Sequence, residues 1–119
     1  MAAPNLLSAT TSNGKTAVVA VGTSATTIIA NSAASGKLLK ILSLYISNVD
    51  GAASADVTVD VYRSSTAYRL CYTVAVANDK ALIVIGSDAP IYLEEGDTLR
   101  ATASASGDLE AVCSYTDIS

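Results

Sequence analysis

Histidine, tryptophan and phenylalanine are absent from the 119-residue chain, and charged residues make up only 15% of it. Without histidine the chain lacks the commonest general base, the Ser-His-Asp triad and the usual nitrogen ligand of zinc. No other motif in the sequence indicates catalysis or cofactor binding. We therefore predict that the protein is not an enzyme and that it holds no cofactor or metal.

Positive charge is scarce and dispersed. The seven Lys and Arg residues form no run that could neutralise successive phosphates, and the net charge is −4, which argues against nucleic acid as a partner. The longest apolar runs, such as residues 81–85, are far shorter than the roughly 20 residues that a helix needs to span a bilayer. The N-terminus lacks a basic leader followed by an apolar segment, so we expect no signal peptide, no membrane partner and a protein that stays in the cytoplasm.

The two cysteines are expected to be free thiols. Strand alternation places Cys71 beside Arg69 and Thr73 on a polar face, whereas Cys113 shares an apolar face with Leu109. Side chains that point apart in a reducing compartment do not form a disulfide.

Glu94, Glu95 and Asp97 form the one acidic cluster that could carry chemistry. Carboxylates near a glycine can bind calcium, and a pair of them can hydrolyse a glycosidic bond. The spacing does not match an EF-hand, and the turn is expected to be solvated, which leaves no burial to raise a pKa. We interpret the cluster as a charged β-turn that keeps a strand end soluble.

Alternation of apolar and polar residues predicts β-strands along most of the chain. Val57, Val59 and Val61 alternate with polar residues, and residues 68–76 alternate in the same way, with Tyr72 among the residues of one face. Turn residues recur at intervals of roughly 8–12 residues, a pattern typical of sandwiches and barrels. The sequence thus predicts an all-β protein, an antiparallel β-sandwich of about eight to nine strands, either jelly-roll or immunoglobulin-like.

The domain organisation is expected to be simple. Residues 1–13 are rich in Ala, Ser and Thr without periodicity, which predicts an extended N-terminal arm that is either frayed or pinned onto a partner. A turn at Asn13-Gly14 then opens a single β-sandwich domain over residues 14–119.

Residues 38–48 are apolar on both faces of a predicted strand, since Leu42 and Leu44 alternate with Leu39 and Ile41. Two apolar faces in a chain of this size predict a central strand that is covered on both faces, either by its own chain or by a neighbouring copy. The small uncharged side chains elsewhere on the surface suit the same contacts. We therefore expect a symmetric homo-oligomer such as a trimer. The predicted interface residues are Leu39, Ile41, Tyr45, Tyr62, Leu6 and Leu7.

Six tyrosines supply all of the aromatic side chains, and each falls in a predicted strand. They are a stacking platform for sugar rings, a set of interface anchors, or ordinary cross-strand packing residues. Tyr62 stands out because alternation places it with the polar residues of its strand.

Three segments carry a resemblance to a known group of proteins: residues 48–51 (NVDG), residues 55–59 (ADVTV) and residues 90–101 (PIYLEEGDTLRA). With them, the chain resembles small all-β structural proteins in the virions of tailed bacteriophages, particularly phages that infect cyanobacteria. The resemblance implies a virion component assembled in the bacterial host cytoplasm. Its most specific form is a capsid decoration (cement) protein that stabilises the head through contacts with the major capsid protein or other virion proteins.

The resemblance leaves a second role open. The chain is alternatively a neck, tail or fibre module that binds a host glycan, with tyrosines such as Tyr62 or Tyr92 stacking on sugar faces. No catalytic residues come with either role.

Overall fold

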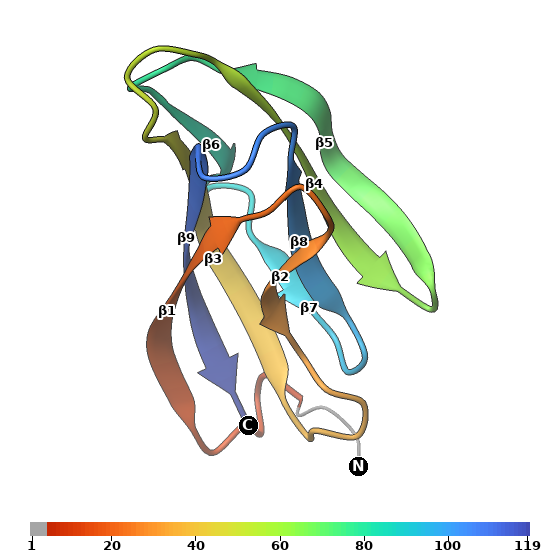
Figure 1. The fold of residues 1–119 in the computed structure, drawn as a ribbon. Coiled ribbons are helices and arrows are strands. Elements are labelled where there is room, and N and C mark those ends of the chain that lie inside the picture. The colour runs from red at the N-terminus through yellow and green to blue at the C-terminus, as the bar shows by residue number, and fades with distance from the viewer. Residues whose placement is uncertain (1–4) are drawn as a thin grey trace.

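The computed structural model describes residues 5–119, in which nine strands and no helix are found. This confirms the predicted all-β class and strand number (Figure 1). Within the described residues no helix could therefore span a membrane. The strands are β1 (Ser12–Val21), β2 (Thr26–Ala30), β3 (Leu38–Asn48), β4 (Ala55–Arg63), β5 (Thr66–Val76), β6 (Ala81–Ile85), β7 (Ile91–Leu93), β8 (Thr98–Ala103) and β9 (Leu109–Ile118).

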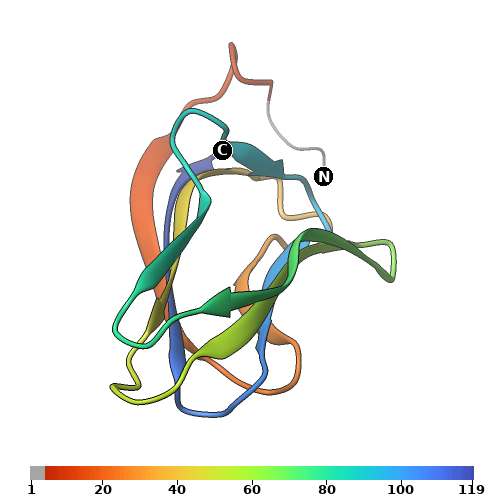
Figure 2. The ribbon, with the colours of Figure 1, turned by 90° about the horizontal axis from the view of Figure 1, so that it is seen from above.

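The strands form two antiparallel sheets that face each other (Figure 2). One sheet has the order β1-β9-β3-β6, with β7 also paired to β3, and the other has the order β2-β8-β4-β5. If β6 and β7, which both pair with β3, are counted as one strand, the chain pairs from its two ends inward: β1 with β9, β2 with β8, β3 with β6 and β7, and β4 with β5. This is the jelly-roll order, in contrast to the ABED and CFG sheets of an immunoglobulin domain.

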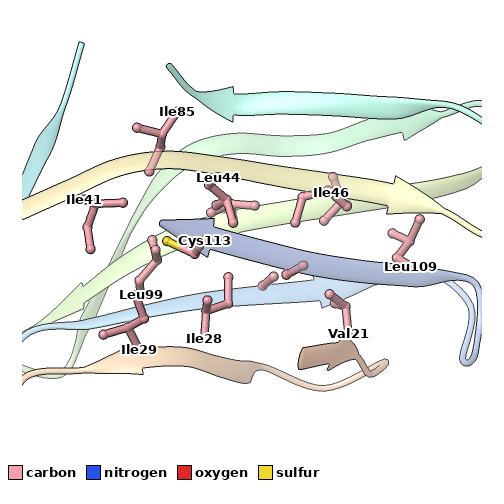
Figure 3. Close-up of a cluster of buried hydrophobic side chains, with 14 of the residues drawn as sticks. Val21, Ile28, Ile29, Ile41, Leu44, Ile46, Ile85, Leu99, Leu109 and Cys113 are labelled. Carbon is pink, nitrogen blue, oxygen red and sulfur yellow. The ribbon is translucent and has the colours of Figure 1, made fainter. Parts of the chain in front are cut away.

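One apolar core fills the space between the sheets (Figure 3). The alternation predicted for β4 is confirmed, because Val57 and Val59 are fully buried and Val61 packs against the core. The largest fully buried apolar side chains include Ile41, Leu44, Ile46, Leu93, Leu99, Leu109, Val21 and Cys113. Every buried polar side-chain atom among the described residues has a hydrogen-bond partner, as stable interiors require.

A β-bulge in β3 overturns the prediction of two apolar faces. Between Ile41 and Ser43 the register advances by two residues on β3 but by one on β9, so Leu42 is the extra residue and the alternation changes phase there. Leu39 and Ile41, 5% and 0% exposed, consequently point into the core, as Leu44 does. Their predicted place on a surface open to a partner is wrong, because the core of their own chain already covers them.

β5 contains two further irregularities, which overturn the alternation predicted for residues 68–76. Its register against β4 slips twice, and Thr73 within it has a φ of 46°. As a result Tyr72 is exposed, whereas Cys71 is partly buried and packs against the core. The prediction that Cys71 lies on a polar face is therefore wrong.

The N-terminal strand begins earlier than predicted. Asn13 and Gly14 lie within β1, paired with Asp117 and Thr116 of β9, so they form no turn and the predicted boundary at residue 14 falls inside a strand. Ahead of β1, the amides of residues 10 and 11 both donate to the carbonyl of Ser119 at 2.9 Å. Residues 1–4 of the predicted arm lie outside the described residues.

A matched pair of substitutions tests the register of β3. We expect Leu39→Ala to lower the free energy of unfolding by about 2–5 kcal/mol, as for other buried leucines. Leu42→Ala should have a much smaller effect, because Leu42 is only partly buried. Urea denaturation followed by circular dichroism gives both values, and a larger loss for Leu42→Ala would contradict the bulge.

Candidate functional site

The outer side of the β1-β9-β3-β6 sheet carries very little charge. Four rows of directly opposed residues cross it, and only Lys40 and Glu110 in them are charged. We call these rows the neutral face. They are Gly14–Thr116–Lys40–Tyr92, Thr16–Ser114–Ser43, Val18–Val112–Tyr45–Ile83 and Ala20–Glu110–Ser47–Ala81.

The third row is apolar along its whole length. Val18, Tyr45 and Ile83 are 71%, 41% and 60% exposed, and Val112 between them is partly buried. Because opposed residues on neighbouring strands lie about 5 Å apart, the four side chains form one continuous stripe across the sheet. We call it the apolar row. Large apolar side chains grouped in this way on a surface mark a contact site far better than isolated ones do.

Two bulges place the apolar row on the surface. The bulge in β3 turns Tyr45 outward, and a second shift, between Leu44 and Tyr45 in their pairing with β6, brings Ile83 opposite Tyr45. A shallow groove of about 400 Å³ adjoins the row at β1 and β9. It is lined by Val18, Val19, Ala20, Glu110, Ala111 and Val112.

On the outer side of the β2-β8-β4-β5 sheet, in contrast, charged and aromatic side chains are paired with one another. Arg100 donates through Nε to the buried carboxylate of Asp60 at 2.9 Å, and its guanidinium lies 3.9 Å from the centre of the Tyr62 ring. Tyr62 is therefore already stacked within its own chain. The structure thus places the predicted interface residues Tyr45 and Tyr62 on opposite sheets.

Leu6 and Leu7 lie in a turn that precedes β1. The amide of Leu7 donates to Asn5 Oδ1 at 2.9 Å, and the amide of Ser8 donates to the Asn5 carbonyl at 3.0 Å. Leu7 is 98% exposed. These two leucines remain available for the contacts predicted for them, whereas Leu39 and Ile41 do not.

Carboxylates of the acidic cluster make hydrogen bonds within the chain that stabilise the fold. Asp97 is only 2% exposed, so the prediction of a solvated turn is wrong for this residue. Arg63 donates to its carboxylate through Nε at 2.7 Å and through Nη2, and the amide of Glu94 donates at 2.8 Å. Burial opposes the ionisation of Asp97, but these hydrogen bonds outweigh it and hold its pKa below the ordinary value. Glu95 accepts a hydrogen bond from the amide of Gly36 at 2.9 Å.

These contacts leave no acid pair at the turn with the free carboxylates that metal binding or hydrolysis needs. Across residues 5–119, no group of three or more His, Cys, Asp or Glu side chains is placed to hold a metal ion.

A groove of about 340 Å³ contains one of the tyrosines considered for sugar stacking. It is lined by Val61, Arg63, Tyr68, Ile91 and Tyr92. Tyr92 and Tyr68 are both exposed there, whereas Tyr62 is not among its residues.

Both cysteines are free, as predicted. Cys113 is fully buried, and burial raises the pKa of its thiol to about 12. Burial also raises the pKa of Cys71. Thiols held protonated in this way are poor nucleophiles.

The sequence predicts Tyr45 as an interface residue but not Val18, Val112 or Ile83. Each lies in a strand with apolar residues at neighbouring positions, so alternation alone did not separate the core face from the outer face. The signal that identifies them is the register across four strands, which no single strand contains.

Comparison with known proteins gives neighbours by structure alone. No family model matches the chain, and no curated protein matches it. A chain from a capsid structure of the Helicobacter pylori bacteriophage KHP30 matches with a TM-score of 0.54 and 12% identity, covering 93% of this chain and 90% of that one. A chain from Bacillus endospore appendages, described as disulfide-linked pili, matches with a TM-score of 0.51 and 16% identity, covering 90% of this chain and 85% of that one. At these identities the likeness is one of fold.

Removing Arg63 tests the role of the acidic turn. Arg63→Ala leaves the buried Asp97 carboxylate short of partners, and we expect a loss of about 1–3 kcal/mol in the free energy of unfolding at neutral pH. Because the pKa of folded Asp97 is depressed, this stabilisation is present above the unfolded value of about 3.9 and disappears as the pH falls through the lower folded value. The difference between wild type and variant should therefore shrink in acid.

The matched control is Arg69→Ala, because Arg69 takes part in no ion pair among the described residues. Urea denaturation at several pH values measures both variants. Equal losses for the two arginines, or a difference that grows in acid, would contradict the structural role of the turn.

Proposed function

We propose that the protein is a non-catalytic structural subunit of a tailed-phage virion, and most specifically a capsid decoration (cement) protein that stabilises the head. The observation that carries this proposal is the neutral face with its apolar row. The jelly-roll fold, shared with a phage capsid chain, is consistent with it. So is the resemblance of residues 48–51, 55–59 and 90–101 to small virion proteins.

The chemistry of the neutral face suits a protein partner. Its side chains are mostly Ser, Thr, Ala, Val and Gly, which lose little conformational entropy when they are covered. Burial of the apolar row supplies the free energy of association, and the rows on either side of it consist of polar residues and alanine. A nucleic acid or an anionic surface would find only one cation, Lys40, in the four rows.

The small free energy available from burying the apolar row favours a lattice on which many such contacts are made together. Full burial of a Val, Ile or similar side chain contributes about 1.5–3 kcal/mol, so the apolar row contributes only several kcal/mol. Association costs about 4–15 kcal/mol in lost freedom. A single contact of this kind is weak, whereas several contacts made together on a lattice, aided by Leu6 and Leu7, hold a subunit firmly.

The proposal assigns no catalysis to the chain. The chain contains no histidine, and its thiols are held in the protonated form. Its buried acids are all in ion pairs: Asp60 with Arg100, Asp97 with Arg63, and Asp117 with Lys15 and Lys37. A nucleophile and a base within reach of each other, the minimum for most mechanisms, are not among the site residues described above.

The groove lined by Tyr68 and Tyr92 supports a second candidate, a neck, tail or fibre module that binds a glycan. In this role the two exposed rings would stack on sugar faces, with Arg63 at the border of the groove. Tyr62 is no longer part of this candidate, because its ring is covered by Arg100.

Immunogold electron microscopy of intact virions, with an antibody against the protein, tests the proposal. We expect the label over the whole head, and mass spectrometry of the same purified particles should detect the chain in many copies. A label confined to the neck, tail or fibres would reject decoration in favour of the second candidate. Absence of the chain from purified virions would reject both.

A further inference from the structure

We propose that the neutral face is self-complementary and pairs with the neutral face of a second copy around a two-fold axis, Lys40 of each copy meeting Glu110 of the other. The inference rests on the proposed function, since it names the partner of the same surface. It goes beyond that function in fixing the symmetry and the charged contacts of the pair.

The two charges lie at opposite ends of the face. Lys40 on β3 is in the first row and Glu110 on β9 is in the fourth. Neither takes part in an ion pair among residues 5–119, whereas Lys15, Lys37, Arg63 and Arg100 do. The Lys40 ammonium lies 6.0 Å from the centre of the Tyr92 ring.

A two-fold axis that lies between two such faces and across the strands exchanges the first row with the fourth. Lys40 of one copy then lies near Glu110 of its partner, twice over, because the contact is isologous. The two strands β3 and β9 are adjacent, and long side chains can meet across the about 10 Å that separates packed sheets. Strand directions in such packing stay within about 30° of each other.

The same axis places large side chains against small ones. It exchanges the second row with the third, so the apolar row of each copy faces the hydroxyl row Thr16–Ser114–Ser43 of the other. Tyr45 of one copy therefore faces Ser43 of the other, and Val18 faces Thr16. Alternation of large and small side chains is what lets two faces interdigitate at interior density.

The area of the neutral face predicts a weak dimer. Four strands about 4.8 Å apart, each contributing about seven residues of about 3.3 Å, make a face on the order of 450 Å². Two copies would bury about 900 Å² in total, which is below the roughly 1,200–2,000 Å² of stable specific interfaces and in the range of weak, transient ones. The dimer should consequently depend on concentration and on salt.

Charge reversal tests the pairing by sedimentation equilibrium at low and high salt. We expect Lys40→Glu and Glu110→Lys each to raise the dimer dissociation constant at least about tenfold at low salt, because each creates two like-charge contacts. The double variant, with both changes, should return to within about threefold of wild type. Arg69→Glu and Lys80→Glu are the matched controls for Lys40→Glu, since they make the same change in net charge outside the four rows.

Three results would overturn the pairing: a wild-type protein that stays monomeric at millimolar concentration, single variants that dimerise as wild type does, or a double variant that is not restored. Thermal melts exclude misfolding as the cause. Virion binding separates this inference from the proposed function. Loss of dimerisation in the single variants supports the pairing whether or not they bind virions, whereas absence of the chain from purified virions rejects the proposed function and leaves the pairing standing.

Discussion

The position of β9 between β1 and β3 is the constraint on which the rest of the structure depends. β9 pairs over its whole length with both neighbours, and this joins the last strand to the first and closes the jelly roll (Figure 1). The inner side of β9 supplies Leu109, Ala111 and Cys113 to the core. Its outer side supplies Val112 and Glu110 to the neutral face, so one register sets both the core and the surface.

The two outer sides of the sandwich differ in how many of their side chains find partners within the chain. On the β2-β8-β4-β5 sheet, Asp60, Arg100 and Tyr62 satisfy one another within the chain, and the large side chains that stay exposed, Tyr68, Leu70 and Tyr72, lie on the edge strand β5. On the β1-β9-β3-β6 sheet, the side chains of the apolar row remain exposed to water, and Lys40 and Glu110 have no ion-pair partner among the described residues. Covering these apolar side chains and pairing these charges with a partner would lower the free energy, so association can stabilise this surface.

Much of the fold could be predicted from sequence, because alternation and turn residues report local structure. The β4 pattern of Val57 and Val59 and the number of strands are examples. Bulges could not be predicted, since an extra residue such as Leu42 becomes visible only when its strand is paired. For the same reason Leu39 was placed on the surface. Burial of Asp97 was missed because its partner Arg63 lies 34 residues away in the chain.

Nuclear magnetic resonance of the labelled 12.0 kDa protein, recorded over a range of concentrations, tests the central claim most directly. If the neutral face is the contact surface, shifts that depend on concentration will cluster at Val18, Val112, Tyr45 and Ile83. Resonances of Tyr62 and Arg100, on the other sheet, will not move. Shifts confined to the β2-β8-β4-β5 sheet, or none up to millimolar protein, would contradict the account.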